Sequence, residues 1–416
     1  MAGETKRRFK SWFWQPPRPH GAVDPDRVVT NLELFYDLVY VAVISQVAHR
    51  LAEDVSPRGV AEFAIVFAMI WLAWINGSLY LEIHGRQDGR TRLVVFVQMG
   101  ILVLLAVFTG GAAGETGGPF AITYGALLVV LTWLWYSVRG QDTPEFSRIT
   151  AIYVLCMVAS IVVVLASAIL PPTARLLVWA ALCMAWVVAF IFLGRRPTFQ
   201  ISVAPTESMV ERFGLFTIIV LGEVVIGVVD GLSHATTDAL TILTGILALG
   251  IGFGFWWAYF DVIGRRMPRN EGPNVAIWMV SHLPITLAIA ASGAGMVSLI
   301  AHADDPTVPG ATAALISGAV AVGLVSLAVT SQTLEDARRL PNAYRPVAAA
   351  LTIGAVAALI VGWLPLAPWA LAALLGVILT ALWLIVVGRF LSAGAWTEAE
   401  PDSVPEARAE APDPVA

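Results

Sequence analysis

Long apolar runs recur along the whole chain, and they constrain its fold more than any other feature. Each run reaches about 18 residues, the length that a helix needs to cross a hydrocarbon core of roughly 30 Å. The composition agrees, since 58% of the 416 residues are hydrophobic and 13% are charged. Ordinary globular domains have about 45–50% apolar and about 25% charged residues. We therefore expect a polytopic membrane protein.

The apolar runs are expected to form helices. They are too long for the strands of a membrane barrel and do not alternate polar with apolar residues. Lipid also forces each backbone polar group to find a partner within the protein. The predicted fold class is all-α, with about twelve transmembrane helices near residues 32–50, 59–80, 93–110, 119–138, 149–170, 174–193, 210–229, 238–262, 275–301, 310–331, 346–363 and 367–389.

The distribution of arginine predicts the orientation of these helices. If the N-terminus is cytoplasmic, nearly all basic residues fall on the inner side, and the outer loops keep only Arg50, Arg58 and Arg175. The positive-inside rule predicts this asymmetry. A missed or extra span would scramble it, so the arginines support an even number of spans. Both termini are therefore expected in the cytoplasm.

The two ends of the chain differ from the spans. Residues 1–27 form a basic tail with an aromatic patch, Trp12-Phe13-Trp14, which suits the surface of an anionic leaflet. Residues 391–416 are rich in alanine, proline and glutamate, and we predict a disordered cytoplasmic tail there.

Two similar segments indicate an internal duplication. Residues 80–86 read YLEIHGR and residues 259–265 read YFDVIGR, and each ends a span that contains tryptophans. A polar residue follows early in the next span, Gln98 in one case and His282 in the other. Six spans per half is an even number, so the halves would be parallel repeats related by an axis along the membrane normal.

The predicted repeats are residues 28–196 and 197–390, and their first helices align in two ways. Glu33, Asp37 and His49 have the same spacing as Glu207, Glu211 and Glu223, whereas a second register pairs Glu33 with Glu211 and Phe35 with Phe213. One sequence leaves both registers open.

Glu223 is the most deeply placed charged residue of the spans. An acidic group at the centre of a membrane helix costs about 2.5–3.5 kcal/mol on insertion scales. Such a group must face the bundle, find a partner or hold a proton. Arg212, in the same span, is a natural partner for a neighbouring carboxylate. Glu223 is therefore the strongest candidate for a transport or proton-linked role.

The first span carries an acidic pair near one end and an imidazole near the other. Glu33 and Asp37 lie one helical turn apart on one face, and His49 lies far along the span on another face. Glu33 and Asp37 could therefore form an acidic entrance for cations at that end of the span. An interfacial position explains His49 as well. Helix capping or arginine bridging explains the acids near the cytoplasmic ends of the spans, which are Glu33, Asp37, Glu82, Glu211 and Asp261.

The remaining candidates lie in both halves. Gln98 and His282 are candidates for a transport role, although His282 lies close to Pro284 and could serve only to bond a carbonyl freed by that proline. The expected pocket-lining residues are Trp256, Trp257, Tyr259 and Asp261, and the tryptophans suit interface anchors equally well. Gly250 and Gly254 are expected to permit close helix packing.

Several functional classes have no support in the sequence. Lysine occurs only at Lys6 and Lys10, which excludes a P-loop and a Schiff-base lysine in the spans. The sequence has no G-x-S-x-G, no H-E-x-x-H and no paired-cysteine metal motif. The arginines follow the topology, so nucleic-acid binding is not indicated. We expect no enzyme activity, no metal and no cofactor.

The opening span, LELFYDLVYVAVISQVAH, resembles the signature of the bacterial low temperature requirement protein A family. The first helix of that family reads roughly E-L-F-F-D-L-V-F-V, with Q-x-x-H near its end. The segments ERFGLFTIIVLGE, WWAYFD and SHLP resemble further blocks, and the resemblance covers about residues 28–390. It implies a multi-pass protein of the bacterial plasma membrane, and no established activity. A fainter likeness to lysosomal-type potassium channels covers Phe35-Tyr36-Asp37, with Asn31 in place of their arginine.

The preferred hypothesis is a transporter that passes a small ion or solute through the lipid bilayer, with proton linkage left open. The alternatives are an ion channel and a membrane scaffold or stress-response protein without transport. Acidic residues within both halves favour transport, because a scaffold does not need Glu223 at its depth. The sequence leaves the oligomeric state open, including a homo-oligomer.

The orientation can be tested with a reporter enzyme fused after residue 390. Because the arginine distribution predicts a cytoplasmic C-terminus, we expect a reporter that functions only inside the cell to be active, and one that functions only outside the membrane to be silent. The reverse result would contradict the even number of spans.

Overall fold

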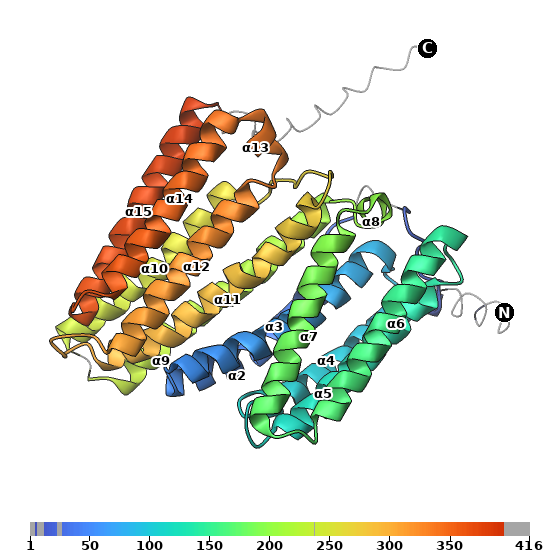
Figure 1. Cartoon of the computed structure of the whole chain (residues 1–416), viewed down its shortest axis with the longest axis horizontal. Helices are drawn as coiled ribbons and strands as arrows, with labels where there is room; N and C mark the ends of the chain where they lie inside the picture. The colour runs from blue at the N-terminus through green and yellow to red at the C-terminus, as the bar shows by residue number, and fades with distance from the viewer. Residues whose placement is uncertain (1–4, 6–11, 23–26, 237, 395–416) are drawn as a thin grey trace, which may run out of the picture.

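The computed structural model describes residues 5, 12–22, 27–236 and 238–394, and these form an all-α bundle (Figure 1). Within them, twelve helices are long and apolar enough to cross a membrane, as the sequence predicted. They are α2 (Asn31–Glu53), α3 (Pro57–His84), α4 (Gly89–Thr109), α5 (Gly117–Val138), α6 (Pro144–Ser167), α7 (Pro172–Leu193), α9 (Glu207–His234), α10 (Ala239–Val262), α11 (Asn274–Ala301), α12 (Gly310–Ser331), α14 (Pro341–Gly362) and α15 (Pro368–Ser392). Two short helices, α8 (Pro197–Ser202) and α13 (Glu335–Arg339), lie in connections.

Local sequence explains where many of these helices begin. Side chains that accept a bond from an N–H group of the first turn cap five of the membrane helices, through Thr30, Ser56, Asp88, Thr206 and Asp238. Proline stands in the first turn of α3, α6, α7, α14 and α15. Proline is favoured there because its missing N–H has no helical partner to lose. These residues set the boundaries that hydropathy alone leaves imprecise.

The long helices form two groups with similar patterns of neighbours, although α10 also packs on α11, a contact without a comparable counterpart between α3 and α4. In the first group, α2 packs on α3 and α4, α3 on α5 and α7, α5 on α4 and α6, and α6 on α7. In the second, α9 packs on α10 and α11, α10 on α12 and α15, α12 on α11 and α14, and α14 on α15. Figure 1 shows the groups as two blocks, with α2, α3, α9 and α11 where they meet.

The two similar segments of the sequence end on the same side of the bundle. Glu82, near the end of α3, accepts a bond from Ser208 at the start of α9. Gln200 in α8, which leads into α9, donates to the carbonyl of Gly272 in the connection after α10. We call this side the arginine-rich end. The membrane orientation of this end remains a prediction.

The N-terminal segment packs across the helix ends on this side. The backbone N–H of Gln15 donates to Asp88 at 3.0 Å, and that of Arg18 donates to the carbonyl of His84 at 3.1 Å. His20 contacts Asp142 through both its backbone and its ring. The predicted basic tail is therefore attached to the bundle over its described part. Residues 395–416 of the predicted C-terminal tail lie outside the described residues.

Helices α9 and α11 approach closely at two glycines. A Cβ atom on Gly227 would lie 2.1 Å from the carbonyl oxygen of Gly293, and one on Gly293 would lie 2.6 Å from the carbonyl oxygen of Glu223. Small residues permit such close contact between membrane helices. Gly254 does the same against Leu379, as expected, whereas Gly250 has open space around it and does not serve packing.

The glycine contact predicts a large difference between two matched substitutions. Gly293→Ala should lower the free energy of unfolding by about 1–3 kcal/mol, because the added methyl group collides with rigid backbone. Gly250→Ala should be neutral, because nothing lies within 4 Å of its Cβ. Thermal unfolding of the purified variants in detergent measures both effects. Equal midpoints for the two variants would contradict the close contact.

Candidate functional site

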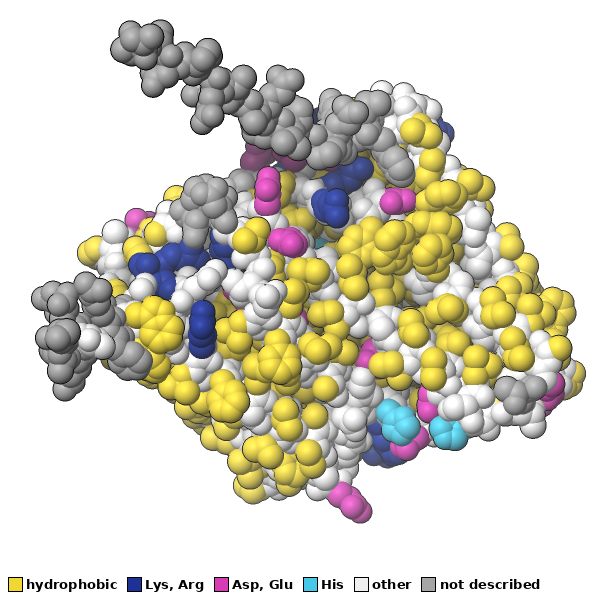
Figure 2. Space-filling view, turned by 180° about the vertical axis from the view of Figure 1, so that it is seen from behind, with side chains coloured by type: hydrophobic (Ala, Val, Ile, Leu, Met, Phe, Trp, Pro, Cys, Tyr) yellow, Lys and Arg dark blue, Asp and Glu magenta, His cyan; other side chains and the backbone are white. Residues whose placement is uncertain are grey.

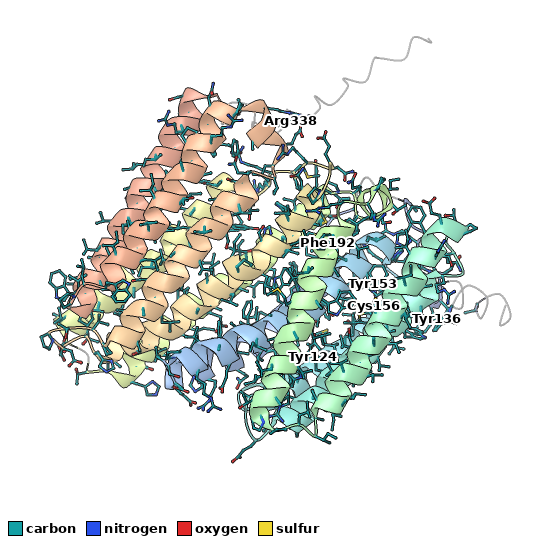
Figure 3. The ribbon with its side chains drawn as sticks, viewed as in Figure 1. Tyr124, Tyr136, Tyr153, Cys156, Phe192 and Arg338 are labelled. Atoms are coloured by element: carbon teal, nitrogen blue, oxygen red, sulfur yellow. The ribbon has the colours of Figure 1, made fainter. Side chains whose placement is uncertain are left out.

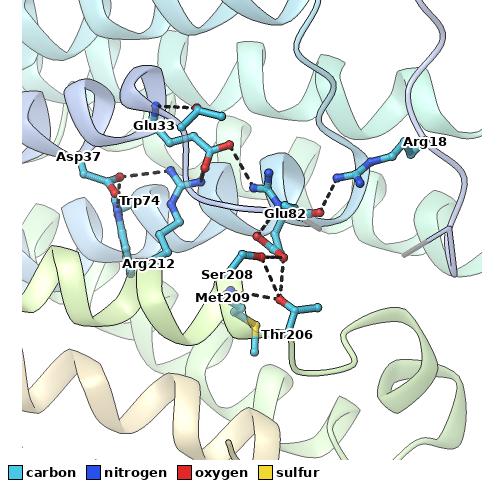
Figure 4. A network of polar contacts seen from close by, with 11 residues as sticks. Arg18, Glu33, Asp37, Trp74, Glu82, Thr206, Ser208, Met209 and Arg212 are labelled. Atoms are coloured by element: carbon cyan, nitrogen blue, oxygen red, sulfur yellow. Dashed lines mark hydrogen bonds and ion pairs between the residues drawn. The ribbon is translucent and has the colours of Figure 1, made fainter. Parts of the chain in front are cut away.

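Arg212 on α9 lies between two acidic residues of α2. Its guanidinium donates to Asp37 at 3.2 Å and lies 3.7 Å from Glu33, and all three side chains are buried (Figure 4). Trp74 of α3 donates from its indole N–H to the same oxygen of Asp37 at 2.8 Å. One cation from the second group of helices is thus held by two anions of the first.

A second arginine extends this network toward the arginine-rich end. Arg27 donates to Glu33 at 3.1 Å and to Glu82 at 2.8 Å. The other oxygen of Glu82 accepts from Ser208 at 2.6 Å and from Thr206 at 2.7 Å. The network therefore joins α2, α3 and the start of α9. We call Arg27, Glu33, Asp37, Trp74, Glu82, Thr206, Ser208 and Arg212 the ion-pair network.

The ion-pair network explains how three carboxylates can be buried together. Isolated charges are strongly disfavoured in an apolar interior, whereas paired and hydrogen-bonded charges are tolerated. Glu33, Asp37 and Glu82 are each within reach of Arg27 or Arg212. Glu33 and Asp37 therefore do not form the open acidic mouth that the sequence suggested. Bridging to arginine, the alternative interpretation, describes both of them.

An aromatic layer follows the network along α9. The ring of Trp74 stacks on Phe216 with centroids 3.9 Å apart and meets the edge of Phe213 at 5.2 Å. All three side chains are buried. Their rings fill the space beside the Asp37–Arg212 pair.

Glu223 lies beyond the aromatic layer, about 16 Å along α9 from Arg212 at 1.5 Å per residue. Its side chain is buried and accepts a hydrogen bond from the hydroxyl group of Ser45 on α2. Among the described residues, no arginine, lysine or histidine forms an ion pair with Glu223. The structure thus places this carboxylate where the two groups of helices meet, without a neighbouring cation.

Gln98 and His282 occupy separate hydrogen-bonded positions. Gln98 accepts from the buried hydroxyl of Tyr36 at 2.6 Å, one residue before Asp37. His282 meets the carbonyl of Trp278 through Nδ1 at 2.7 Å and the hydroxyl of Tyr259 through Nε2 at 3.0 Å. Nδ1 therefore donates and Nε2 accepts, which satisfies a neutral ring. His282 does not bond the carbonyl of Val280, which is the one that Pro284 leaves free.

Several predicted site residues lie apart from this interior. His49 is exposed and faces Glu53 at 3.5 Å, and Glu211 is exposed on α9. Trp256 lies beside an apolar groove between α9 and α10. Trp257 stacks on Trp383 of α15. The indole N–H of Trp383 donates to Asp261 at 2.9 Å. These five residues do not form one site with the ion-pair network.

The first group of helices also contains a cavity that the sequence did not indicate. It has a volume of about 60 Å³ and lies among α3, α5, α6 and α7, where Figure 3 labels Tyr124 and Tyr153. The side-chain amide of Asn76 is a hydrogen-bonded polar group in the lining of this cavity. It accepts from the indole of Trp135 at 2.8 Å and donates to Tyr153 at 2.7 Å.

The interior residues that the sequence missed carry weak signals. Ser45 is an ordinary residue of a membrane helix, and only its partner distinguishes it. Arg27 precedes the first span and has no helical periodicity to place it. Glu82, by contrast, lies in the repeated Tyr-x-acid segment, and its pairing with Arg27 agrees with the arginine bridging that its position suggested.

These observations define a polytopic all-α membrane protein with a buried ion-pair network and an unpaired acid between two groups of helices. Residues 28–387 match the model of the bacterial low temperature requirement A protein, and the chain belongs to this family. An uncharacterized protein of Rhizobium meliloti is 25% identical over 302 residues, which cover 65% of this chain and 69% of the relative. No solved structure shows a significant match.

The ion-pair network predicts that Arg212 is essential for stability. Arg212→Met should reduce the free energy of unfolding by about 3–5 kcal/mol, because Glu33 and Asp37 would keep their buried charges without this partner. Adding Asp37→Asn should restore part of the loss. The control is Arg58→Met, because Arg58 is exposed and bonds only one turn along its own helix. Equal thermal midpoints for Arg212→Met and Arg58→Met in detergent would contradict the prediction.

Proposed function

We propose that this protein is a proton-linked transporter of a small ion or solute, and that Glu223 is its coupling residue. The observation that carries the proposal is the difference between Glu223 and the other buried acids of the interface. Glu33, Asp37 and Glu82 lie beside arginines, whereas Glu223 contacts the neutral Ser45. An ionised carboxylate in this setting needs a proton or a transported cation to neutralise it.

The location of Glu223 supports the proposal further. It lies on the contact between α2 and α9, where one group of helices would move against the other during alternating access. The recurring neighbour pattern of the two groups supports parallel repeats, with the boundary near residue 197. Binding sites of duplicated transporters lie near the bilayer midplane, between their repeats.

The aromatic layer favours a transporter over an open channel. Phe213 and Phe216 lie on α9 between Arg212 and Glu223, and the ring of Trp74 packs against both of them. A permanently conducting pore needs a continuous polar path, whereas a transporter needs a closed layer on one side of its site in each state. The scaffold alternative gives no account of an unpaired acid at this depth, where its insertion cost remains unopposed.

The proposal includes a location in the bacterial plasma membrane with both termini in the cytoplasm. The arginine-rich end would then face the cytoplasm, in accord with the positive-inside rule. The ion-pair network would lie near that surface and would hold α2 and α9 together, while Glu223 would exchange protons deeper in the bilayer.

Glu223→Gln tests the coupling role directly. The amide keeps the shape of the side chain but cannot release a proton, so we expect proton flux into liposomes, followed with a pH-sensitive dye under an imposed potential, to fall to the background of protein-free vesicles. Glu211→Gln is the matched control, because Glu211 is exposed on the same helix. If wild type shows flux and folded Glu223→Gln shows the same flux, Glu223 is not the coupling residue. If wild type shows no proton or solute flux, the scaffold alternative is favoured.

A further inference from the structure

A large cavity opens at the arginine-rich end beside the ion-pair network, whose Arg27 and Glu33 form part of its wall. It has a volume of about 1040 Å³ and is bounded by the N-terminal segment, the start of α2, the end of α3 and the start of α4. Four arginines line it, whereas Glu33 is the only acidic residue among its lining residues, and Arg27 and Arg212 already neutralise that carboxylate. The lining arginines are Arg18, Arg27, Arg86 and Arg92.

The cavity lining changes from charged to apolar. Leu32, Phe35 and Val95 join the arginines, and the side chain of Phe35 is 56% exposed. On α4, Phe96 is 69% exposed one turn beyond Arg92. In the view of Figure 2, most of the visible basic side chains lie in the upper half of the molecule, and hydrophobic side chains cover much of the surface below them. An apolar surface on a membrane helix next to basic groups fits a ligand with an anionic head and an apolar body.

We propose that this cavity binds the headgroup of an anionic phospholipid from the surrounding bilayer. A phospholipid joins a phosphate to acyl chains, so the phosphate would meet the arginines while the chains follow Phe35 and Phe96. Guanidinium groups bind phosphate oxygens through paired N–H donors. Arg86 uses its Nε atom to donate to the carbonyl of Pro16 at 2.8 Å, and a guanidinium has five N–H donors in all.

The N-terminal segment would make this site responsive to the membrane surface. Trp12 lies near the guanidinium of Arg92 at 6.0 Å, and Trp14 near that of Arg90 at 5.4 Å. Both tryptophans are exposed, as suits side chains at the level of lipid headgroups. The bound lipid would therefore join the N-terminal segment to α2, the helix that carries Ser45. The proposal needs only a membrane surface at this end, and it stands independently of transport.

The test is thermal unfolding of the full chain in mild detergent with four separate additions. Phosphatidylglycerol should raise the unfolding midpoint, and salt should weaken this effect. Zwitterionic phosphatidylcholine, glycerol phosphate and inorganic phosphate should leave the midpoint unchanged. Equal effects of the two lipids would overturn a charge-specific site, and stabilisation by glycerol phosphate alone would identify a soluble anion as the ligand and overturn the lipid proposal.

Paired variants localise the effect to the cavity. Arg86→Gln with Arg92→Gln should weaken the affinity for phosphatidylglycerol about thirtyfold, at roughly one charge contact per arginine. The matched control is Arg195→Gln with Arg196→Gln, which removes the same charge from exposed positions at the same end, away from the cavity lining. If the first pair does not accumulate as folded protein, Arg92→Gln alone replaces it. Equal loss in test and control would show that the attraction is diffuse and would overturn the site.

Discussion

The pairing of Arg212 with Glu33 and Asp37 is the interaction on which the arrangement of the two helix groups depends. A guanidinium in an apolar bundle must find anions, and here the anions lie on another helix, 175 or more residues earlier in the chain. This requirement fixes α9 against α2 along their length. Two further contacts belong to this interface. Trp74 stacks on Phe216, and Ser45 bonds to Glu223.

The buried acids of this interface fall into two physical classes. The three carboxylates of the ion-pair network lie beside two arginines and accept further hydrogen bonds from Trp74, Thr206 and Ser208. Glu223 has a hydroxyl partner and, among the described residues, no neighbouring cation. The glycine contact between α9 and α11 occurs at the backbone of Glu223, which limits how far this part of α9 can move on that side. The neutralised acids are suited to holding helices, and the unpaired acid is suited to exchange.

Sequence reasoning predicted the helices well because a membrane helix is a local property. About twenty apolar residues specify a span whatever it packs against, and arginines and caps refine its ends. The family signature also lies within single helices. Partners across helices are different, since a pairing such as Ser45 with Glu223 depends on how whole helices cross. For the same reason, the sequence found Glu33, Asp37 and Arg212 as charged candidates but left open whether the acids form a mouth or bridge to arginine. His49 and Glu211 are exposed, which fits the interfacial and capping alternatives, because polarity alone does not reveal which face of a helix points inward.

The contact between Ser45 and Glu223 bears on how such an interface could arise. The two residues are 178 positions apart, which is also the offset of the register that pairs Glu33 with Glu211. In that register they are equivalent residues that meet each other, as happens on the two-fold axis of a dimer. A symmetric dimer of one half would have to place two glutamates, or two serines, face to face there. If the halves are repeats in this register, joining them into one chain removes this restriction and allows a single acid, with a neutral partner, at the centre.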